Sequence, residues 1–202
     1  MLSYNDSLKI LKETNALLEG HFILSSGLHS DQYVQCAMLL SHPEKAQLIC
    51  ASLSEKIKEN FKDIDIILSP AIGGIVVGYE IGRQLEVRTM FAERLNEKLK
   101  LRRGFNLEKN SNILIIEDVV TTGKSALECS EIVRNSGANL LGYACIIDRS
   151  NDNLLIEDKI ISQIKIKIPT FNNDNLPENL KKIPVTKPGS RNLSKWKNLD
   201  WV

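Results

Sequence analysis

Short apolar runs alternate with longer amphipathic stretches along the chain from residue 64 onward. The runs are rich in Ile, Val and Leu at successive positions, which is typical of strands buried on both faces. They cover residues 64–68, 87–91, 113–116 and 140–147. Because helix-like stretches separate them, the order predicts an α/β fold with a central, mostly parallel sheet flanked by helices.

Two helices are predicted from apolar residues that recur every three to four positions. The first begins at Pro43, which suits the first turn of a helix, with Ser41 or His42 as its cap. Its inward positions are Ala46, Ile49, Cys50, Leu53 and Ile57. The second covers residues 124–135, and Gly137 is placed to end it in a left-handed turn. We expect both helices to pack on the sheet.

Three further segments set the expected limits of the domain. Residues 92–110 are crowded with charge and show little periodicity, so we expect a mobile loop. Residues 164–168 alternate Ile with Lys and predict an edge strand that ends at a proline. The remaining chain is rich in Asn, Pro and Lys, with one helical turn predicted at 178–182. We therefore assign residues 1–168 to a single domain and residues 169–202 to a C-terminal extension on its surface.

Length and charge limit the classes of function. With 202 residues the chain is long enough for one well-buried domain and too short for two of ordinary size. Its formal net charge of +1 does not favour nucleic acid or a membrane surface, so we expect a small-molecule partner. The first residues lack the basic start and apolar run of a signal peptide, and no stretch approaches the roughly 20 apolar residues of a membrane span. These features predict a cytoplasmic protein.

Cysteine and histidine usage gives no sign of a metal site. The four cysteines, at positions 36, 50, 129 and 145, are scattered among apolar neighbours without a C-x-x-C pair, so we expect them to be reduced and buried. The histidines His21, His29 and His42 are too dispersed to hold a metal, and we expect them to act in capping or surface contacts.

Candidate chemistry is concentrated where the third strand meets the second helix. The residues at this junction are Glu117, Asp118, Val119, Val120, Thr121, Thr122, Gly123, Lys124 and Ser125. Backbone N–H groups at a helix start are unpaired and carry partial positive charge, which favours a bound phosphate. The hydroxyl side chains add donors, and the glycine lets the backbone approach closely. The two acids suit the hydroxyls of a ribose, so the junction predicts a site for a ribose phosphate.

Two other interpretations fit this junction less well. Gly123-Lys124-Ser125 is shared with the P-loop of nucleoside triphosphate-binding proteins, but that motif requires a glycine where this chain has Asp118. The other interpretation is a capped helix that follows a core strand with two incidental acids. Adjacent acids at the end of a buried strand are costly without a partner, which argues against it.

The junction resembles the signature of type I phosphoribosyltransferases that binds 5-phosphoribosyl 1-pyrophosphate (PRPP). Three further stretches are similar to the orotate-specific branch of that family, and the likeness spans about residues 17–150. They are residues 20–27 with 30–33, residues 69–74, and residues 91–94 leading into Lys98 and 102–105. The resemblance implies the type I phosphoribosyltransferase fold, with a small hood formed by the N-terminal region and the chain ends.

The resemblance also implies a reaction. Orotate and PRPP would give orotidine 5′-phosphate and pyrophosphate, with Mg²⁺ carried in on the pyrophosphate. PRPP would be bound by residues 117–125 and by the cations Arg94, Lys98 and Lys100 of a mobile lid. It further implies a homodimer in which the lid of one subunit reaches the active site of the other.

Roles within the reaction are carried over by position. Lys98 and Asp118 are the expected catalytic residues, Lys98 because a lid cation can stabilise charge on the departing pyrophosphate. Thr121 and Arg149 are expected to contact orotate, since an arginine fork suits a ring carboxylate.

The chain departs from the family pattern at several positions. Lysines common in the family are replaced by Ser25, Gly73 and Leu95, and a frequent histidine is replaced by Lys100. We expect Lys100 and the two arginines that follow it, Arg102 and Arg103, to take up part of the pyrophosphate charge.

Two other functions stay open. A phosphoribosyltransferase for another base would share the PRPP segment but should lack the 91–94 stretch and Arg149. A non-catalytic PRPP-binding regulator would need a basic or helix-turn-helix surface for nucleic acid, which the near-neutral charge does not suggest.

Overall fold

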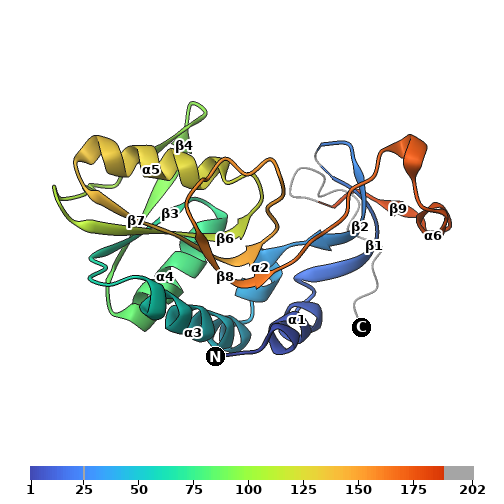
Figure 1. Cartoon of the computed structure of the whole chain (residues 1–202), viewed down its shortest axis with the longest axis horizontal. Coiled ribbons are helices and arrows are strands. Elements are labelled where there is room, and N and C mark those ends of the chain that lie inside the picture. The colour runs from blue at the N-terminus through green and yellow to red at the C-terminus, as the bar shows by residue number, and fades with distance from the viewer. Residues whose placement is uncertain (25, 189–202) are drawn as a thin grey trace. The chain divides into compact units, whose positions relative to one another are not determined.

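The structure is a computed structural model that describes residues 1–24 and 26–188 (Figure 1). The chain divides into two compact units, which are considered one at a time. The larger unit contains residues 1–16 and 36–167, and the smaller contains residues 17–35 together with the chain from Ile168 onward.

Among the described residues, the larger unit forms a six-stranded sheet with strand order β5-β4-β3-β6-β7-β8. The strands run parallel except β5, which is antiparallel to β4. Their bounds are β3 (Ile66–Pro70), β4 (Arg88–Leu95), β5 (Lys98–Leu101), β6 (Asn112–Val120), β7 (Asn139–Asp148) and β8 (Ile160–Lys165). The predicted α/β fold with a mostly parallel central sheet is confirmed.

Helices cover both faces of this sheet (Figure 1). On one face, α5 (Lys124–Ser136) packs against β3, β5, β6 and β7. On the other, α3 (Pro43–Asn60) and α4 (Gly73–Leu85) pack together, and α4 contacts β3, β4 and β6. The helix α1 (Tyr4–Glu13) contacts β8, and the short α2 (Cys36–Leu40) contacts α3 and α4.

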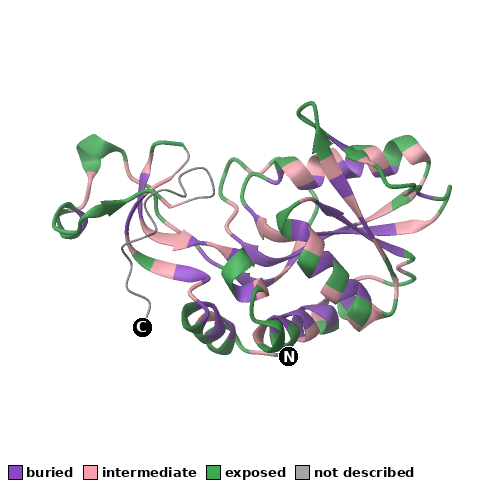
Figure 2. Ribbon diagram, turned by 180° about the vertical axis from the view of Figure 1, so that it is seen from behind, coloured by how far each residue is buried: buried purple, intermediate pink, exposed green. Residues whose placement is uncertain are grey.

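The core follows the apolar runs of the sequence, and Figure 2 shows buried residues along the central strands. Every residue of β3 is buried, as are Ile113 to Ile116 of β6. Burial of one such side chain contributes about 1.5–3 kcal/mol relative to exposure. The buried centre of the sheet therefore holds the ends of its strands in fixed positions.

Most predicted elements form, with shifted ends. The helices that begin at Pro43 and Lys124 are confirmed, and Gly137 ends the second with φ 75°. The strand predicted at 113–116 extends to Val120, so the two acids lie inside β6 rather than after it. The capping prediction is confirmed for His42, which is the cap residue of the helix that begins at Pro43, although its side chain makes no capping hydrogen bond. The Ser41 hydroxyl instead donates to the carbonyl of Met38.

The mobile loop predicted at residues 92–110 is wrong in its first half. The strands β4 and β5 form a hairpin there, with Asn96 and Glu97 at its turn. Both turn residues have positive φ, as two-residue turns that match the strand twist require. Leu99 is 6% exposed and packs in the core cluster, as Leu101 does in part, so β5 has one dry face.

The smaller unit joins two distant parts of the sequence. Its strands β1 (Leu17–Ile23) and β2 (His29–Val34) are antiparallel, and β9 (Val185–Thr186) runs parallel to β1. The elements η1 (Asn173–Asn175) and α6 (Glu178–Lys181) precede β9, and α6 confirms the predicted helical turn.

The chain from Ile168 to residue 188 therefore differs from the surface extension expected there. It completes the small sheet and buries Leu180, because the two N-terminal strands offer an edge that needs a backbone partner. Residues 189–202, the rest of the predicted extension, lie outside the described part of the chain. The edge strand expected at 164–168 is β8, which starts at Ile160 and ends at Lys165.

Two histidines of the smaller unit form a buried pair. His21 Nε2 and His29 Nδ1 are 2.6 Å apart, and His21 Nδ1 lies 3.0 Å from the carbonyl oxygen of Ile183. The carbonyl can only accept, so Nδ1 of His21 carries a proton and, in the neutral pair, Nδ1 of His29 donates to His21 Nε2. The predicted capping or surface role is wrong for both residues.

Other sequence-based expectations have simple outcomes. All four cysteines are free and buried. None of the helices in the described part of the chain has the length and apolar character of a membrane span.

Candidate active site

The carboxyl edge of the parallel sheet in the larger unit gathers the predicted site residues. β3 ends before Gly73, β6 ends before the Thr121-Thr122-Gly123 turn, and β7 ends before Arg149. The N–H of Arg149 donates to the carbonyl of Val120 at 2.8 Å, which joins two of these ends directly. Open parallel sheets bind ligands at this edge.

The turn between β6 and α5 has the geometry predicted for a phosphate site. Gly123 is the cap residue of α5 with φ 74°, and it supplies no side chain to cap the helix. Thr121, Thr122 and Lys124 are exposed around it, and Ser125 is partly exposed. The N–H groups of the first helical turn therefore face a space bordered by hydroxyl groups, where an anion is stabilised.

A segment that sequence reasoning missed braces this turn. The N–H of Leu155 donates to the carbonyl of Thr122 at 2.8 Å. A Cβ on Gly123 would lie 2.7 Å from the Ile156 side chain, so the glycine is required by packing as well as by its positive φ. The brace comes from an irregular loop after β7, and no motif in the sequence marks it.

The two acids of β6 point to opposite faces of the sheet, as successive strand residues do. Asp118 faces α4, where a Cβ on Gly73 would meet its carboxylate. Glu117 faces α5, where burial raises the pKa of Cys129 and the Glu117 charge raises it further. Burial and the neighbouring Asp118 raise the pKa of Glu117 from 4.5 to about 8. Burial also raises the pKa of Asp118, although backbone N–H groups oppose the shift. Because burial disfavours the charged form of both acids, a hydroxyl or cationic partner would stabilise them.

The hairpin distributes its cations over two faces. Arg94 pairs with Leu99 across the strands, and Glu93 pairs with Lys100. Side chains alternate along each strand, so Arg94 lies on the α5 face while Lys98 and Lys100 lie on the opposite face. Within the described residues, the side chain of neither lysine takes part in an ion pair or hydrogen bond.

The arginines of the hairpin already have acidic partners. Arg94 contacts Glu128 of α5 at 3.0 Å, and both Arg102 and Arg103 contact Glu93. Arg103 also lies over the ring of Phe91. Of the cations that were expected to compensate for missing lysines, Lys100 is the one whose charge is uncommitted among the described residues.

Arg149 follows a buried acid at the end of β7. Asp148 accepts from the N–H of Ser150 at 2.8 Å and lies 2.9 Å from Lys165. Burial acts to raise the pKa of Asp148, but these hydrogen bonds and the Lys165 charge outweigh it, so the pKa is lowered. The charged carboxylate therefore fixes the backbone on both sides of Arg149.

The site residues are thus brought together only in part. Residues 117–125 and Arg149 meet at one edge, whereas Arg94 and Lys98 lie on different faces of the hairpin. Ser25 lies outside the described residues. No group of three or more His, Cys, Asp or Glu within residues 1–24 and 26–188 is placed to hold a metal ion.

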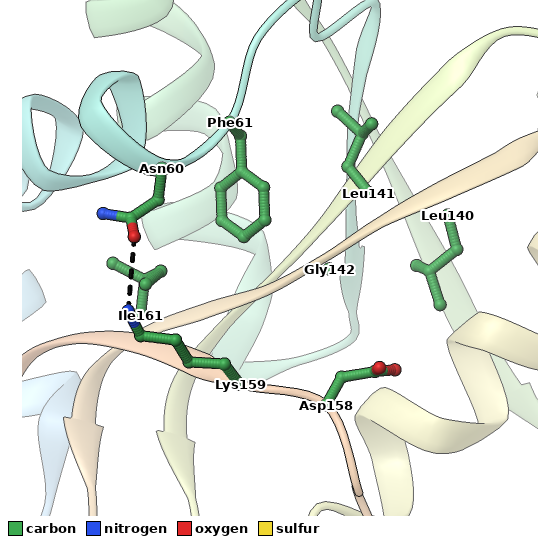
Figure 3. Close-up of a pocket in the computed structure, with 8 residues that line it drawn as sticks. All are labelled: Asn60, Phe61, Leu140, Leu141, Gly142, Asp158, Lys159 and Ile161. Atoms are coloured by element: carbon green, nitrogen blue, oxygen red, sulfur yellow. Dashed lines mark hydrogen bonds between the residues drawn. The ribbon is translucent and has the colours of Figure 1, made fainter.

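A cavity of about 240 Å³ lies at the amino edge of the same sheet, where β7 and β8 begin (Figure 3). Phe61 and Leu140 line it, and Gly142 leaves space for the ring of Phe61. Lys159 reaches across to Asn60 at 3.4 Å. None of the predicted site residues lines this cavity, so it is separate from the candidate active site.

Comparison with known proteins places these features in a family. The chain matches the model of the phosphoribosyl transferase domain over residues 36–181. It is 45% identical over 193 residues to the orotate phosphoribosyltransferase of Parvibaculum lavamentivorans, which covers 94% of this chain and 100% of that protein.

Solved structures show the same fold. Orotate phosphoribosyltransferase from Aeropyrum pernix matches 78% of this chain and 92% of that chain, with TM-score 0.69 and 21% identity. Adenine phosphoribosyltransferase from Thermoanaerobacter pseudethanolicus matches 67% and 88%, with TM-score 0.57 and 16% identity. These matches confirm the type I phosphoribosyltransferase fold, but the fold serves more than one base. The choice of base therefore depends on sequence similarity and on side chains.

Proposed function

The chain belongs to the phosphoribosyltransferase family, and from that premise we propose that it transfers the 5-phosphoribosyl group of PRPP to orotate. This glycosyltransferase reaction gives orotidine 5′-phosphate and pyrophosphate, a step of pyrimidine biosynthesis. The observation that carries the proposal is the course of β6 into α5, with two enclosed acids, a glycine turn and a helix start without a side-chain cap. The 45% identity to an orotate phosphoribosyltransferase supports orotate as the base.

PRPP is proposed to bind along the β6–α5 junction. The 5-phosphate would lie against the first turn of α5, where N–H groups and the helix dipole stabilise an anion. The contacts would come from Val119, Val120, Thr121, Thr122, Gly123, Lys124 and Ser125. The ribose would lie across the end of β6. There Glu117 and Asp118, on opposite faces of the strand, can each accept a hydrogen bond from a ribose hydroxyl.

The hairpin is proposed to act on the leaving pyrophosphate. Breaking the bond to pyrophosphate places negative charge on the leaving oxygens while the ribose becomes cationic. Lys98 and Lys100 carry uncommitted charge on one face of β5, which suits them to meet that negative charge as a lid closes. Arg94 would add to PRPP binding through the part of its side chain that is exposed, which is 42%. Asp118 would stabilise the positive charge on the ribose.

Orotate is proposed to be held by Arg149 and Thr121. A guanidinium forms two parallel hydrogen bonds with a carboxylate, and Asp148 fixes the backbone from which Arg149 projects. Thr121 follows the β6 strand end, to which Arg149 is hydrogen-bonded through Val120. Both side chains therefore start from the same short stretch of the sheet edge.

Magnesium is proposed to enter with PRPP rather than in a protein cage. Glu117 and Asp118 are the acids of the proposed PRPP segment, and they point to opposite faces of β6, so they do not form a joint chelate for one ion. Bound Mg²⁺ would supply neutralisation of the pyrophosphate charge. The protein's own part is to hold the ribose with these carboxylates and to bring Lys98 to the leaving group.

A homodimer is also proposed, with the lid of one subunit at the active site of the other. An exposed apolar stripe on α4 supports it. Ile72, Val76 and Tyr79 are 86%, 50% and 66% exposed and recur at helical spacing. A second copy of the chain would cover this stripe with the same stripe, as two-fold symmetric interfaces do. We further propose a cytoplasmic location, which the free state of the four cysteines supports.

The proposed reaction is tested by base specificity. The purified protein is incubated with PRPP, Mg²⁺ and one base at a time, and ultraviolet absorbance follows consumption of orotate, adenine, hypoxanthine or uracil. Consumption of orotate alone is expected, with stoichiometric release of pyrophosphate. Preference for a purine would replace orotate in the proposal. Binding of PRPP without turnover of any base would instead favour the PRPP-binding regulator.

A further inference from the structure

Glu128 connects the helix of the phosphate turn to both strands of the lid hairpin. It lies on α5, four residues after Lys124, and its side chain is only 19% exposed. It accepts hydrogen bonds from both terminal nitrogens of Arg94, at 3.0 and 3.2 Å. It also accepts from the backbone N–H of Leu99 at 3.2 Å. Arg94 belongs to β4 and Leu99 to β5, so one carboxylate ties both strands to α5.

This contact fixes the backbone beside Lys98. The N–H of Leu99 belongs to the peptide that joins Lys98 to Leu99, so holding it fixes the Cα from which the Lys98 side chain leaves. Arg94 faces Leu99 across the hairpin and also donates to the carbonyl of Glu97, just before Lys98. The two terminal nitrogens of Arg94 and the N–H of Leu99 thus anchor the backbone around Lys98 to the helix that begins at the phosphate turn.

The charge balance of the contact suits a position near an anion. An uncompensated carboxylate on the hairpin would weaken the attraction of the hairpin lysines for the leaving pyrophosphate. Arg94 neutralises Glu128 through a two-point contact, and such contacts are the most geometrically specific ion pairs. The negative charge is therefore used to orient the hairpin without opposing the substrate.

We propose that Glu128 is a positioning residue for phosphoribosyl transfer, holding the hairpin so that Lys98 is directed correctly toward the leaving pyrophosphate. The inference rests on the proposed function. A partly exposed ion pair contributes little to stability, typically up to about 1 kcal/mol, whereas misplacing a catalytic group by about 1 Å can reduce turnover about 100-fold. Positioning and mere structural support therefore predict different results.

The test compares Glu128→Ala and Glu128→Gln with the matched control Glu131→Gln on the exposed side of the same helix. We expect Glu128→Ala to lower kcat about 10- to 100-fold, while KM for orotate changes less than about twofold and the Tm falls by only a few degrees. Glu128→Gln keeps an acceptor for Leu99, so it should retain more activity than the alanine variant. Glu131→Gln should match the wild type.

A double variant separates positioning through Arg94 from an unrelated effect. If Glu128 acts through Arg94, then Arg94→Ala combined with Glu128→Ala should lose no more activity than the worse single variant. Wild-type turnover of orotate together with an unchanged kcat in Glu128→Ala would overturn the positioning role alone. Fully additive losses would overturn the route through Arg94. Absence of orotate turnover in the wild type itself would instead overturn the proposed function.

Discussion

A Cβ on Gly73 would lie 2.8 Å from each carboxylate oxygen of Asp118, so the acid occupies the space where any other side chain would begin. Gly73 is also the first residue of α4. This arrangement gives a physical reason for glycine at a position where the family resemblance predicts lysine. In this conformation a lysine would displace the carboxylate that is proposed to hold the ribose.

Gly73→Ala is therefore expected to raise KM for PRPP several-fold by displacing Asp118, with little change in KM for orotate. Steady-state kinetics with each substrate varied provides the measurement. The same substitution in an Asp118→Ala background removes the clash, so there it should stabilise the fold by up to about 1 kcal/mol through the helix propensity of alanine. If Gly73→Ala changes KM for PRPP by the same factor in the wild type and in the Asp118→Ala background, the close approach of Gly73 and Asp118 is unimportant.

Glu117 should make stability depend on pH. Its pKa is raised from 4.5 to about 8, so between these values the folded state binds more protons than the unfolded state. The stabilisation is complete below about pH 4.5 and is lost as the pH rises through about 8, at about 1.4 kcal/mol for each unit of pKa shift. Urea unfolding of the unliganded protein should therefore give a free energy of unfolding that falls from pH 5.5 to pH 8.5.

The variant Glu117→Gln isolates this contribution. A neutral amide has nothing to titrate, so the fall in stability with pH should be smaller than in the wild type, and the variant should be the more stable protein at pH 8.5. Glu131→Gln, on the exposed side of α5, should keep the wild-type dependence. If Glu117→Gln shows the same slope as the wild type, the carboxyl group is not the source of the effect.

The central sheet and the phosphate turn were predictable because local sequence determines them. The apolar runs of β3 and β6 can be stable only when buried on both faces. A glycine between a strand and a helix favours a tight turn, because it adopts positive φ without strain. The left-handed turn at Gly137 was predictable for the same reason. These features depend on neighbours within one turn or one strand.

Features that depend on distant partners were not predictable in the same way. The His21–His29 contact joins two strands, and its third member, Ile183, lies more than 150 residues away. The brace on Thr122 by Leu155 comes from a loop without a motif. The β5 strand is a different case, because its Lys-Leu-Lys-Leu alternation is typical of a strand with one buried face. The high charge of the surrounding segment instead favoured the prediction of a loop.

Lys98→Ala is expected to lower kcat about 100-fold or more while KM for PRPP changes only a few-fold. The reason is that the lysine would act on charge that develops as pyrophosphate leaves, and so would stabilise the transition state more than bound substrate. Pre-steady-state and steady-state assays measure the two effects. Lys109→Ala, an exposed lysine outside the hairpin, serves as the matched control. Unchanged turnover in Lys98→Ala would remove the lid lysine from the mechanism.

The stripe on α4 predicts the effect of a charge on assembly. Tyr79→Glu places a carboxylate within the proposed interface, where a symmetric partner would present the same charge, so we expect a shift from dimer to monomer. Light scattering after size-exclusion chromatography measures the mass. Leu48→Glu is the control, because Leu48 is also about half exposed but lies on α3. A dimer that survives Tyr79→Glu would show that α4 is not the interface.

Mixing two inactive variants tests whether the lid is shared between subunits. If Lys98 of one subunit serves the active site of the other, a mixed dimer of Lys98→Ala and Asp118→Asn subunits contains one site with a lysine and an aspartate. Random reassociation makes half of the dimers mixed, so the mixture should recover about a quarter of wild-type activity. A lid that serves its own subunit leaves every site defective, and the mixture would then remain as inactive as its parents. Recovery therefore requires both a dimer and exchange of the hairpin between active sites.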